Sequence, residues 1–112
     1  DLGGLGLTRI RAATLASLAA AVDSDPRLLR AYDSLDETVE RLRALPGVGP
    51  WTAHYICMRA LREPDAFPTA DLGLLRALET PAGRPSAAEL ARRAEAWRPW
   101  RAYAAMRLWT QP

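Results

Sequence analysis

The carboxylate best placed for chemistry in this sequence is that of Asp71. Asp71 follows a loop that contains Pro64 and Pro68, and it precedes an apolar run that begins at Leu72. This pattern predicts a helix over about 71–78, and a helix dipole stabilises a carboxylate at its N-terminus in the ionised form. Such a carboxylate can stabilise a developing positive charge or orient a water molecule. It can also do no more than cap its helix, and the local sequence alone favours the capping role.

A glycine-containing turn precedes this aspartate. Residues 45–53 read Leu-Pro-Gly-Val-Gly-Pro-Trp-Thr-Ala. They join two segments with helical patterns, 35–44 and 50–61. Gly47 and Gly49 permit backbone angles closed to other residues, and Pro50 suits the first turn of a helix. The second helix should then begin with unpaired N–H groups at the positive end of its dipole, which favours a bound phosphate. The alternative is a plain helical hairpin whose glycines only close the turn.

The charges around this turn are all positive. No acidic residue occurs from 41 to 62, where the basic residues are Arg41, Arg43, Arg59 and Arg62. Residues 23–40 carry six acids and two arginines, whereas residues 92–112 carry five arginines and one glutamate. The net charge of +2 is weak evidence for any kind of partner, but these alternating blocks suggest one basic face.

Composition and length predict one globular domain. A chain of 112 residues with 49% hydrophobic residues can bury a single core, and no apolar run approaches the ~20 residues of a membrane span. There is no secretory signal peptide, and the single Cys57, within an apolar helix, is expected to be buried. These features suggest an intracellular setting. Because the sequence begins at Asp1 rather than at a methionine, we expect it to be a fragment.

Helical periodicity and capping signals recur along the whole chain. Ser34 and Ser86 each begin a capping box, with a glutamate three residues later. Besides the two helices of the hairpin, the pattern predicts helices at about 8–22, 25–32, 71–78 and 86–97 and a last one from Pro99 to about 110. No segment alternates polar and apolar residues in the manner of a strand. The predicted fold is all-α, with six or seven helices.

The turn and Asp71 together resemble a known family. A spacing of 20 residues between Trp51 and Asp71, with a Phe-Pro pair between them, is the layout of the helix-hairpin-helix DNA glycosylase superfamily. The segments 5–15, 51–55, 66–71 and 97–104 are similar to the bacterial 3-methyladenine DNA glycosylase II branch. The resemblance covers nearly the whole chain, and its most specific parts are the turn and the Trp-Arg-Pro-Trp-Arg motif. It implies a helix-hairpin-helix at about 35–62.

The resemblance implies a reaction. Enzymes of this kind hydrolyse the N-glycosidic bond of alkylated purines, such as 3-methyladenine and 7-methylguanine, after the base has been flipped out of double-stranded DNA. Asp71 would stabilise the oxocarbenium-like sugar or orient the attacking water. Members that also cut the strand carry a lysine two residues after the second glycine of the turn. That position is Trp51 here, and because the chain contains no lysine, a lysine Schiff base is excluded. No cofactor is expected for the chemistry.

Aromatic residues supply the base pocket that the resemblance implies. Trp51, Tyr55 and Trp109 would wall it, and such rings attract a cationic base by roughly 0.5–2 kcal/mol per contact. Trp51 and Tyr55 share a helix face that could line either a core or a cleft. For Trp109 the same two locations, core and cleft, stay open. The remaining tryptophans, Trp97 and Trp100, are expected to be core residues.

The resemblance also assigns backbone contacts around the turn. Residues expected to contact the DNA backbone are Gly47, Val48, Gly49, Trp51 and Thr52. A monovalent cation would be held by the backbone carbonyls of Arg43, Leu45 and Val48. His54 lacks a visible catalytic partner and is expected to be either a surface residue or a residue on the phosphate side. In the family's two-carboxylate loop an acidic residue directly precedes the catalytic aspartate, and that position is Ala70 here. This departure affects how a metal ion or a water molecule would be placed.

The expected partner is double-stranded DNA with alkylated bases, in the bacterial cytoplasm at the nucleoid. Glycosylases of this branch are longer and carry an N-terminal α/β domain and a side chain that fills the gap left by the flipped base, none of which is found in this sequence. A separate N-terminal part, or self-association of the fragment, would have to complete the cleft. Two other functions stay open: a non-catalytic DNA-binding hairpin module or inactive fragment, and a helical interaction domain without a nucleic-acid partner.

Overall fold

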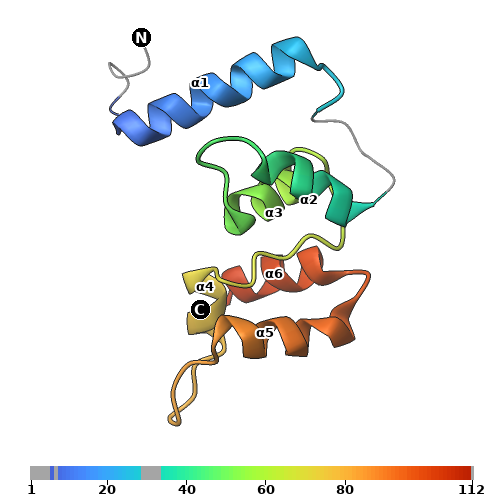
Figure 1. Cartoon of the computed structure of the whole chain (residues 1–112). Helices are drawn as coiled ribbons and strands as arrows, with labels where there is room; N and C mark the ends of the chain where they lie inside the picture. Colours follow the sequence, from blue (N-terminus) through green and yellow to red (C-terminus); the bar gives the residue numbers. More distant parts are fainter. Residues whose placement is uncertain (1–5, 7, 29–33, 112) are drawn as a thin grey trace.

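The computed structural model describes residues 6, 8–28 and 34–111. These residues form six α-helices and one 3-10 helix, which confirms the all-α prediction: α1 (Arg9–Ser24), α2 (Leu35–Arg43), α3 (Pro50–Arg59), α4 (Leu72–Ala77), α5 (Ala87–Ala94), η2 (Glu95–Trp97) and α6 (Arg101–Trp109). Figure 1 shows three tiers, with α1 outermost, the α2–α3 hairpin in the middle, and α4, α5 and α6 on the far side of the hairpin.

Side-chain caps begin the helices where the sequence predicts them. The hydroxyl of Ser34 accepts a hydrogen bond from the N–H of Glu37 at 3.1 Å, and Ser86 caps α5 in the same way. Thr8 caps α1. The helix expected over 25–32 is a turn in its described part, residues 26–28, and its remainder lies outside the described residues.

The core lies between the hairpin and the α4–α6 tier. Leu42, Phe67, Leu74 and Leu90 are at most 1% exposed, and Phe67 meets Trp97 edge-on at 5.8 Å between ring centroids. Cys57 is buried as predicted, and burial raises the pKa of its thiol to about 11, so the thiol stays protonated.

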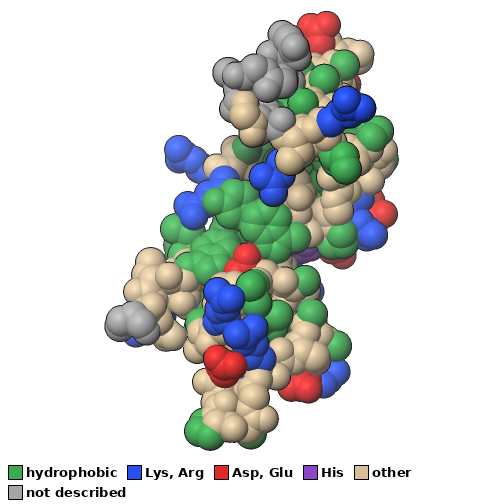
Figure 2. All heavy atoms as spheres, turned by 90° about the vertical axis from the view of Figure 1, so that its left-hand side faces the viewer, with side chains coloured by type: hydrophobic (Ala, Val, Ile, Leu, Met, Phe, Trp, Pro, Cys, Tyr) green, Lys and Arg blue, Asp and Glu red, His purple; other side chains and the backbone are tan. Residues whose placement is uncertain are grey.

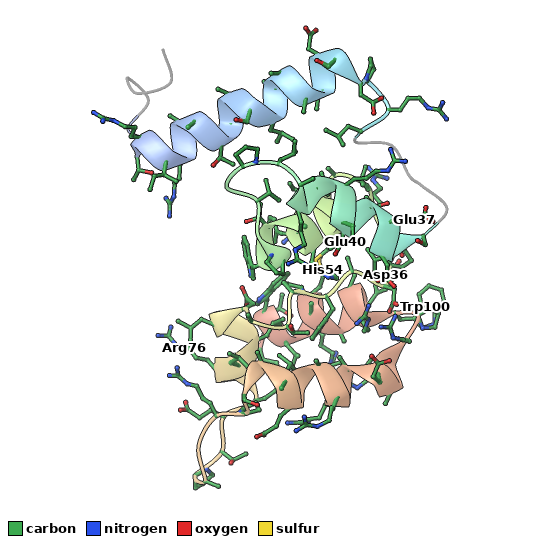
Figure 3. All side chains as sticks on the ribbon, in the orientation of Figure 1. Asp36, Glu37, Glu40, His54, Arg76 and Trp100 are labelled. Carbon is green, nitrogen blue, oxygen red and sulfur yellow. The ribbon has the colours of Figure 1, made fainter. Side chains whose placement is uncertain are left out.

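Two predictions about tryptophans have different outcomes. Trp97 packs against the core as expected. Trp100 was expected in the core, but its side chain is 58% exposed and stacks edge-on only against Tyr103, which is itself exposed. Trp100 is the N-cap residue of α6, and at that position its side chain points outward from the tier, as Figure 3 shows.

Helix α1 lies over the hairpin turn and buries none of its own residues. Its contact with the turn is close at Gly47, where an added Cβ would overlap the side chain of Thr14. Within the described residues, no helix is long and apolar enough to cross a membrane.

Candidate active site

The carboxylate of Asp71 joins three helices. Asp71 is the N-cap residue of α4, where its Oδ2 accepts a hydrogen bond from the N–H of Leu74 at 2.9 Å. The predicted capping role is therefore present. The same carboxylate also accepts the indole N–H of Trp51 from α3 at 2.8 Å on Oδ1 and that of Trp109 from α6 at 2.7 Å on Oδ2.

A capping role alone does not require these two indoles. One N–H from the first turn of α4 satisfies a cap, whereas here two tryptophan side chains from distant parts of the chain aim their only polar group at the same carboxylate. The donors fix the orientation of both oxygens, and the side chain of Asp71 stays partly exposed at the surface. The result is an anchored carboxylate beside the N-terminal end of α3.

Gly73 makes this arrangement sterically feasible, and no sequence pattern pointed to this role. A Cβ at Gly73 would lie 3.0 Å from Oδ2 of Asp71 and 3.2 Å from Cδ1 of Trp109. Both distances are shorter than ordinary van der Waals contacts. A larger residue at position 73 would therefore push the Trp109 indole away from the carboxylate.

The aromatic residues predicted for a base pocket lie together beside Asp71. Trp51 and Tyr55 are stacked, with ring centroids 4.9 Å apart and an interplanar angle of 12°. The ring centroids of Tyr55 and Trp109 are 6.2 Å apart, and the two ring planes are inclined by 58°. Trp51 is 39% exposed, so the shared helix face of Trp51 and Tyr55 borders the surface rather than a closed core. On this side of the molecule, Figure 2 shows a continuous hydrophobic area with arginines on either side of it.

The two glycines of the turn differ in their backbone requirements. Gly47 has φ +81°, a left-handed conformation that favours glycine, as predicted. Gly49 has φ −92° and ψ −175°, which any residue adopts, and no described atom outside its chain neighbours lies within 4 Å of an added Cβ. The prediction of special backbone angles is therefore wrong for Gly49. Because glycine has no side chain, the space beside this position is open.

The N-terminus of α3 presents free backbone donors. Gly49 is its N-cap and offers no capping side chain, and Pro50 occupies the first turn. The N–H groups of Gly47, Gly49, Trp51 and Thr52 donate to no described residue. The N–H of Val48 is different, because it donates to the carbonyl of Leu45 at 3.1 Å, and so it is not available to a ligand. The remaining amides and the helix dipole favour an anion.

Carbonyl oxygens of the same turn could hold a cation. No described N–H donates to the carbonyls of Arg43 or Val48, and the carbonyl of Leu45 accepts one hydrogen bond and keeps a second lone pair. Oxygen donors of this kind suit a hard cation. Among the described residues, no cluster of His, Cys, Asp and Glu side chains could hold a metal ion.

An ion pair that sequence reasoning missed holds the loop that leads to Asp71. Asp65 accepts hydrogen bonds from Nε of Arg101 at 2.9 Å and from Nη1 of Arg98 at 2.8 Å. The side chains of Asp65 and Arg101 are 14% and 8% exposed. The N–H of Ala102 also donates to the carbonyl of Pro64 at 2.8 Å. These contacts attach the loop to the start of α6.

His54 holds the same loop from the side of α3. Its Nδ1 accepts a hydrogen bond from the backbone N–H of Phe67 at 3.1 Å, and its side chain is only partly exposed. The side chain of His54 is therefore half-buried rather than fully at the surface, and its expected place beside the phosphate stays a prediction. Burial, and then the positive charge of Arg101, lowers the pKa of His54 below its ordinary value of 6.5. The neutral form is the one that can accept from Phe67.

This contact predicts a pH dependence of stability. Because the pKa of His54 is lower in the folded than in the unfolded protein, the unfolded protein binds more protons as the pH falls below 6.5. The contribution is therefore fully present above that value and is lost as the pH falls through the folded pKa. Denaturant titrations from about pH 7 to about pH 5 should show a smaller loss of unfolding free energy for His54→Asn, whose amide oxygen accepts from Phe67 at every pH. Equal losses in the two proteins would contradict this role.

Comparison with known proteins reveals relatives of one kind. The chain is 43% identical over 113 aligned residues to a protein of Mycobacterium tuberculosis named "Probable bifunctional transcriptional activator/DNA repair enzyme AlkA", a match that covers 98% of this chain and 22% of that relative. It is 32% identical to "DNA-3-methyladenine glycosylase 2" of Escherichia coli, over 96% of this chain and 37% of that relative. The "DNA-3-methyladenine glycosylase" of Bacillus subtilis is 37% identical over 62% of this chain.

No protein-family model matches the chain. The chain spans between 22% and 37% of the length of these three relatives. Its similarity to the proteins of M. tuberculosis and E. coli extends over 98% and 96% of its own residues. By homology, then, the chain belongs to the family of the DNA-3-methyladenine glycosylases and matches one part of their length.

Proposed function

We propose that the protein is a monofunctional DNA glycosylase of base-excision repair, which hydrolyses the N-glycosidic bond of alkylated purines. The observation that carries this proposal is the position of the Asp71 carboxylate. It accepts hydrogen bonds from the indoles of Trp51, at the start of α3, and Trp109, on α6. The names of the relatives support 3-methyladenine as a substrate, and we propose 7-methylguanine as a second one.

In this proposal the alkylated base leaves the DNA stack and is received by the rings of Trp51, Tyr55 and Trp109. An alkylated purine carries positive charge and leaves as a neutral molecule, so its bond to the sugar breaks with little acid catalysis. The anchored carboxylate of Asp71 then stabilises the oxocarbenium-like sugar or orients the water that attacks it. Since the chain contains no lysine, strand cleavage through a lysine Schiff base is not part of the reaction.

The turn supplies the grip on the DNA backbone. The N–H groups of Gly47, Gly49, Trp51 and Thr52 have no described acceptor, and they would donate to phosphate oxygens at the positive end of the α3 dipole. A monovalent cation on the carbonyls of Arg43, Leu45 and Val48 would add positive charge beneath that phosphate. Arg59 and Arg62 provide further positive charge, whereas Arg43 is paired with Glu40 at the surface.

The segment acts within a larger site. Because the relatives are much longer than this chain, we propose that an N-terminal part, or self-association of this segment, supplies the opposite wall of the cleft and the side chain that fills the gap left by the flipped base. A protein with this substrate would work in the cytoplasm at the nucleoid.

Base release from alkylated DNA tests the function directly. Double-stranded DNA treated with a methylating agent should release 3-methyladenine and 7-methylguanine when incubated with the intact protein, without strand cleavage. Binding of the same DNA without base release would instead assign a non-catalytic hairpin module. Absence of both release and binding would leave only a helical interaction domain.

The glycines of the turn provide a separate test of the DNA grip. Gly49→Ala should lower the unfolding free energy by no more than about 1 kcal/mol, the cost of alanine at this N-cap, because its backbone is unstrained and the space around it is open. It should nevertheless weaken DNA binding several-fold on all sequences, because a methyl group would stand where a phosphate approaches and phosphate contacts carry no base information. A loss confined to particular sequences would contradict the grip.

Gly47→Ala is the matched comparison. Here the left-handed backbone and the overlap with Thr14 should lower the unfolding free energy by about 1–2 kcal/mol in addition to weakening DNA binding. Chemical denaturation and fluorescence anisotropy with two unrelated duplexes separate the two effects.

A further inference from the structure

Arg59 lies on the aromatic cluster that is proposed to receive the base. Its guanidinium carbon is 5.5 Å from the centroid of the Tyr55 ring and 5.9 Å from that of the Trp109 ring. Trp51, Tyr55 and Arg59 follow one another at intervals of four residues, so they stand in a row on one face of α3. Tyr55 is stacked against Trp51 on one side and meets the guanidinium of Arg59 as its next neighbour along the row.

Tyr55 and Trp109 do not form a parallel sandwich for a base in this arrangement. A purine held between Tyr55 and Trp109 would need two parallel rings separated by twice the stacking distance. Instead the two rings are inclined by 58°, and the same guanidinium lies over both. A planar cation of the protein itself thus occupies the aromatic faces that would attract a planar cationic base.

Among the described residues, only the rings of Tyr55 and Trp109 are seen to bind the guanidinium of Arg59. Arg59 is exposed, forms no ion pair with a described carboxylate, and makes no described hydrogen bond through its side chain. A cation–π contact at an exposed site is weak enough to be exchanged for another ligand.

We infer that Arg59 is an internal ligand of the aromatic pocket, which every purine must displace before it can bind. This inference rests on the proposed function, because it takes the Tyr55–Trp109 surface to be the base pocket. The displacement penalty is the same for any purine, since the same contact is lost each time. Weakly held normal bases are thereby kept out, while cationic bases, which bind the rings more strongly, still enter.

Equilibrium binding of two nucleosides to the intact protein tests the inference. The probes are 1-methyladenosine, which is cationic at neutral pH, and neutral adenosine. Arg59→Gln should bind both nucleosides roughly two- to five-fold more tightly than the wild type, which is the factor expected from losing one exposed cation–π competitor. The matched control is Arg92→Gln, which removes one exposed arginine from α5 and should change neither affinity.

The other outcomes of the nucleoside-binding experiment would contradict the inference. Unchanged or weaker binding of both nucleosides by Arg59→Gln would overturn the inference, since Arg59 would then not compete. A gain for 1-methyladenosine alone would also overturn it, because that result indicates charge repulsion rather than occupancy of the rings. If neither nucleoside bound to either protein, the base pocket of the proposed function would fall as well.

Nuclear magnetic resonance of the wild type gives a readout that needs no variant. In the free protein, the ring currents of Tyr55 and Trp109 should shift the Nε–Hε proton signal of Arg59 upfield. Saturation with 1-methyladenosine should return that signal toward the position of an unstacked arginine. A signal at the unstacked position in the free protein, or no change on saturation, would contradict the inference.

Discussion

Asp71→Asn is expected to lower the rate of base release by at least roughly 10²-fold, the scale on which preorganised electrostatic stabilisation contributes to catalysis. Asparagine keeps the shape of the side chain and caps helices about as well as aspartate, so α4 should retain its start at Leu72. What is lost is the negative charge that faces the sugar in the proposed reaction. An amide group in place of one oxygen also cannot accept from both Trp51 and Trp109.

DNA affinity should stay within a few-fold of the wild type, because the donors at the N-terminus of α3 are untouched. Single-turnover base release and anisotropy on the same alkylated duplex measure the two effects. The matched control is Asp36→Asn, which removes the same charge from an exposed position in the first turn of α2, shown in Figure 3. Full excision by Asp71→Asn would refute the catalytic assignment. An equal loss in both variants would point to net charge instead.

Asp65→Ala is expected to lower the unfolding free energy by about 3 kcal/mol, because it leaves the buried guanidinium of Arg101 without its partner. The carboxylate of Asp65 also accepts from Arg98 and, at 3.4 Å, from the backbone N–H of Arg101 at the start of α6. Among the described residues, removal of this carboxylate therefore leaves the loop that leads to Asp71 attached to the start of α6 only by the backbone hydrogen bond from Ala102 to Pro64.

Glu95→Gln is the control for this effect. Glu95 pairs with Arg98 at the surface, where its side chain is 60% exposed, so its loss should change stability much less. Urea unfolding of the three proteins, followed by tryptophan fluorescence, measures the difference. If Asp65→Ala were as stable as Glu95→Gln, the ion pair would not be what fixes this loop.

The sequence by itself determined the features that depend on local interactions. The capping residues Ser34 and Ser86, the positive φ of Gly47 and the proline at the start of α3 are all set by residues within a few positions of one another. Helix periodicity and caps are local in the same way, so the all-α fold and the hairpin could be predicted with nearly correct bounds. The capping position of Asp71 belongs to this class.

Only the tertiary structure decided how these elements meet. The indoles of Trp51 and Trp109 reach Asp71 from positions 20 and 38 residues away, and Gly73 is needed only because they do. The contact of His54 with Phe67 is likewise long-range. Helix packing sets such distances, and no local pattern encodes them. For the same reason the exposure of Trp100 could not be predicted, since it depends on what lies beyond the start of α6 rather than on the hydrophobicity of tryptophan.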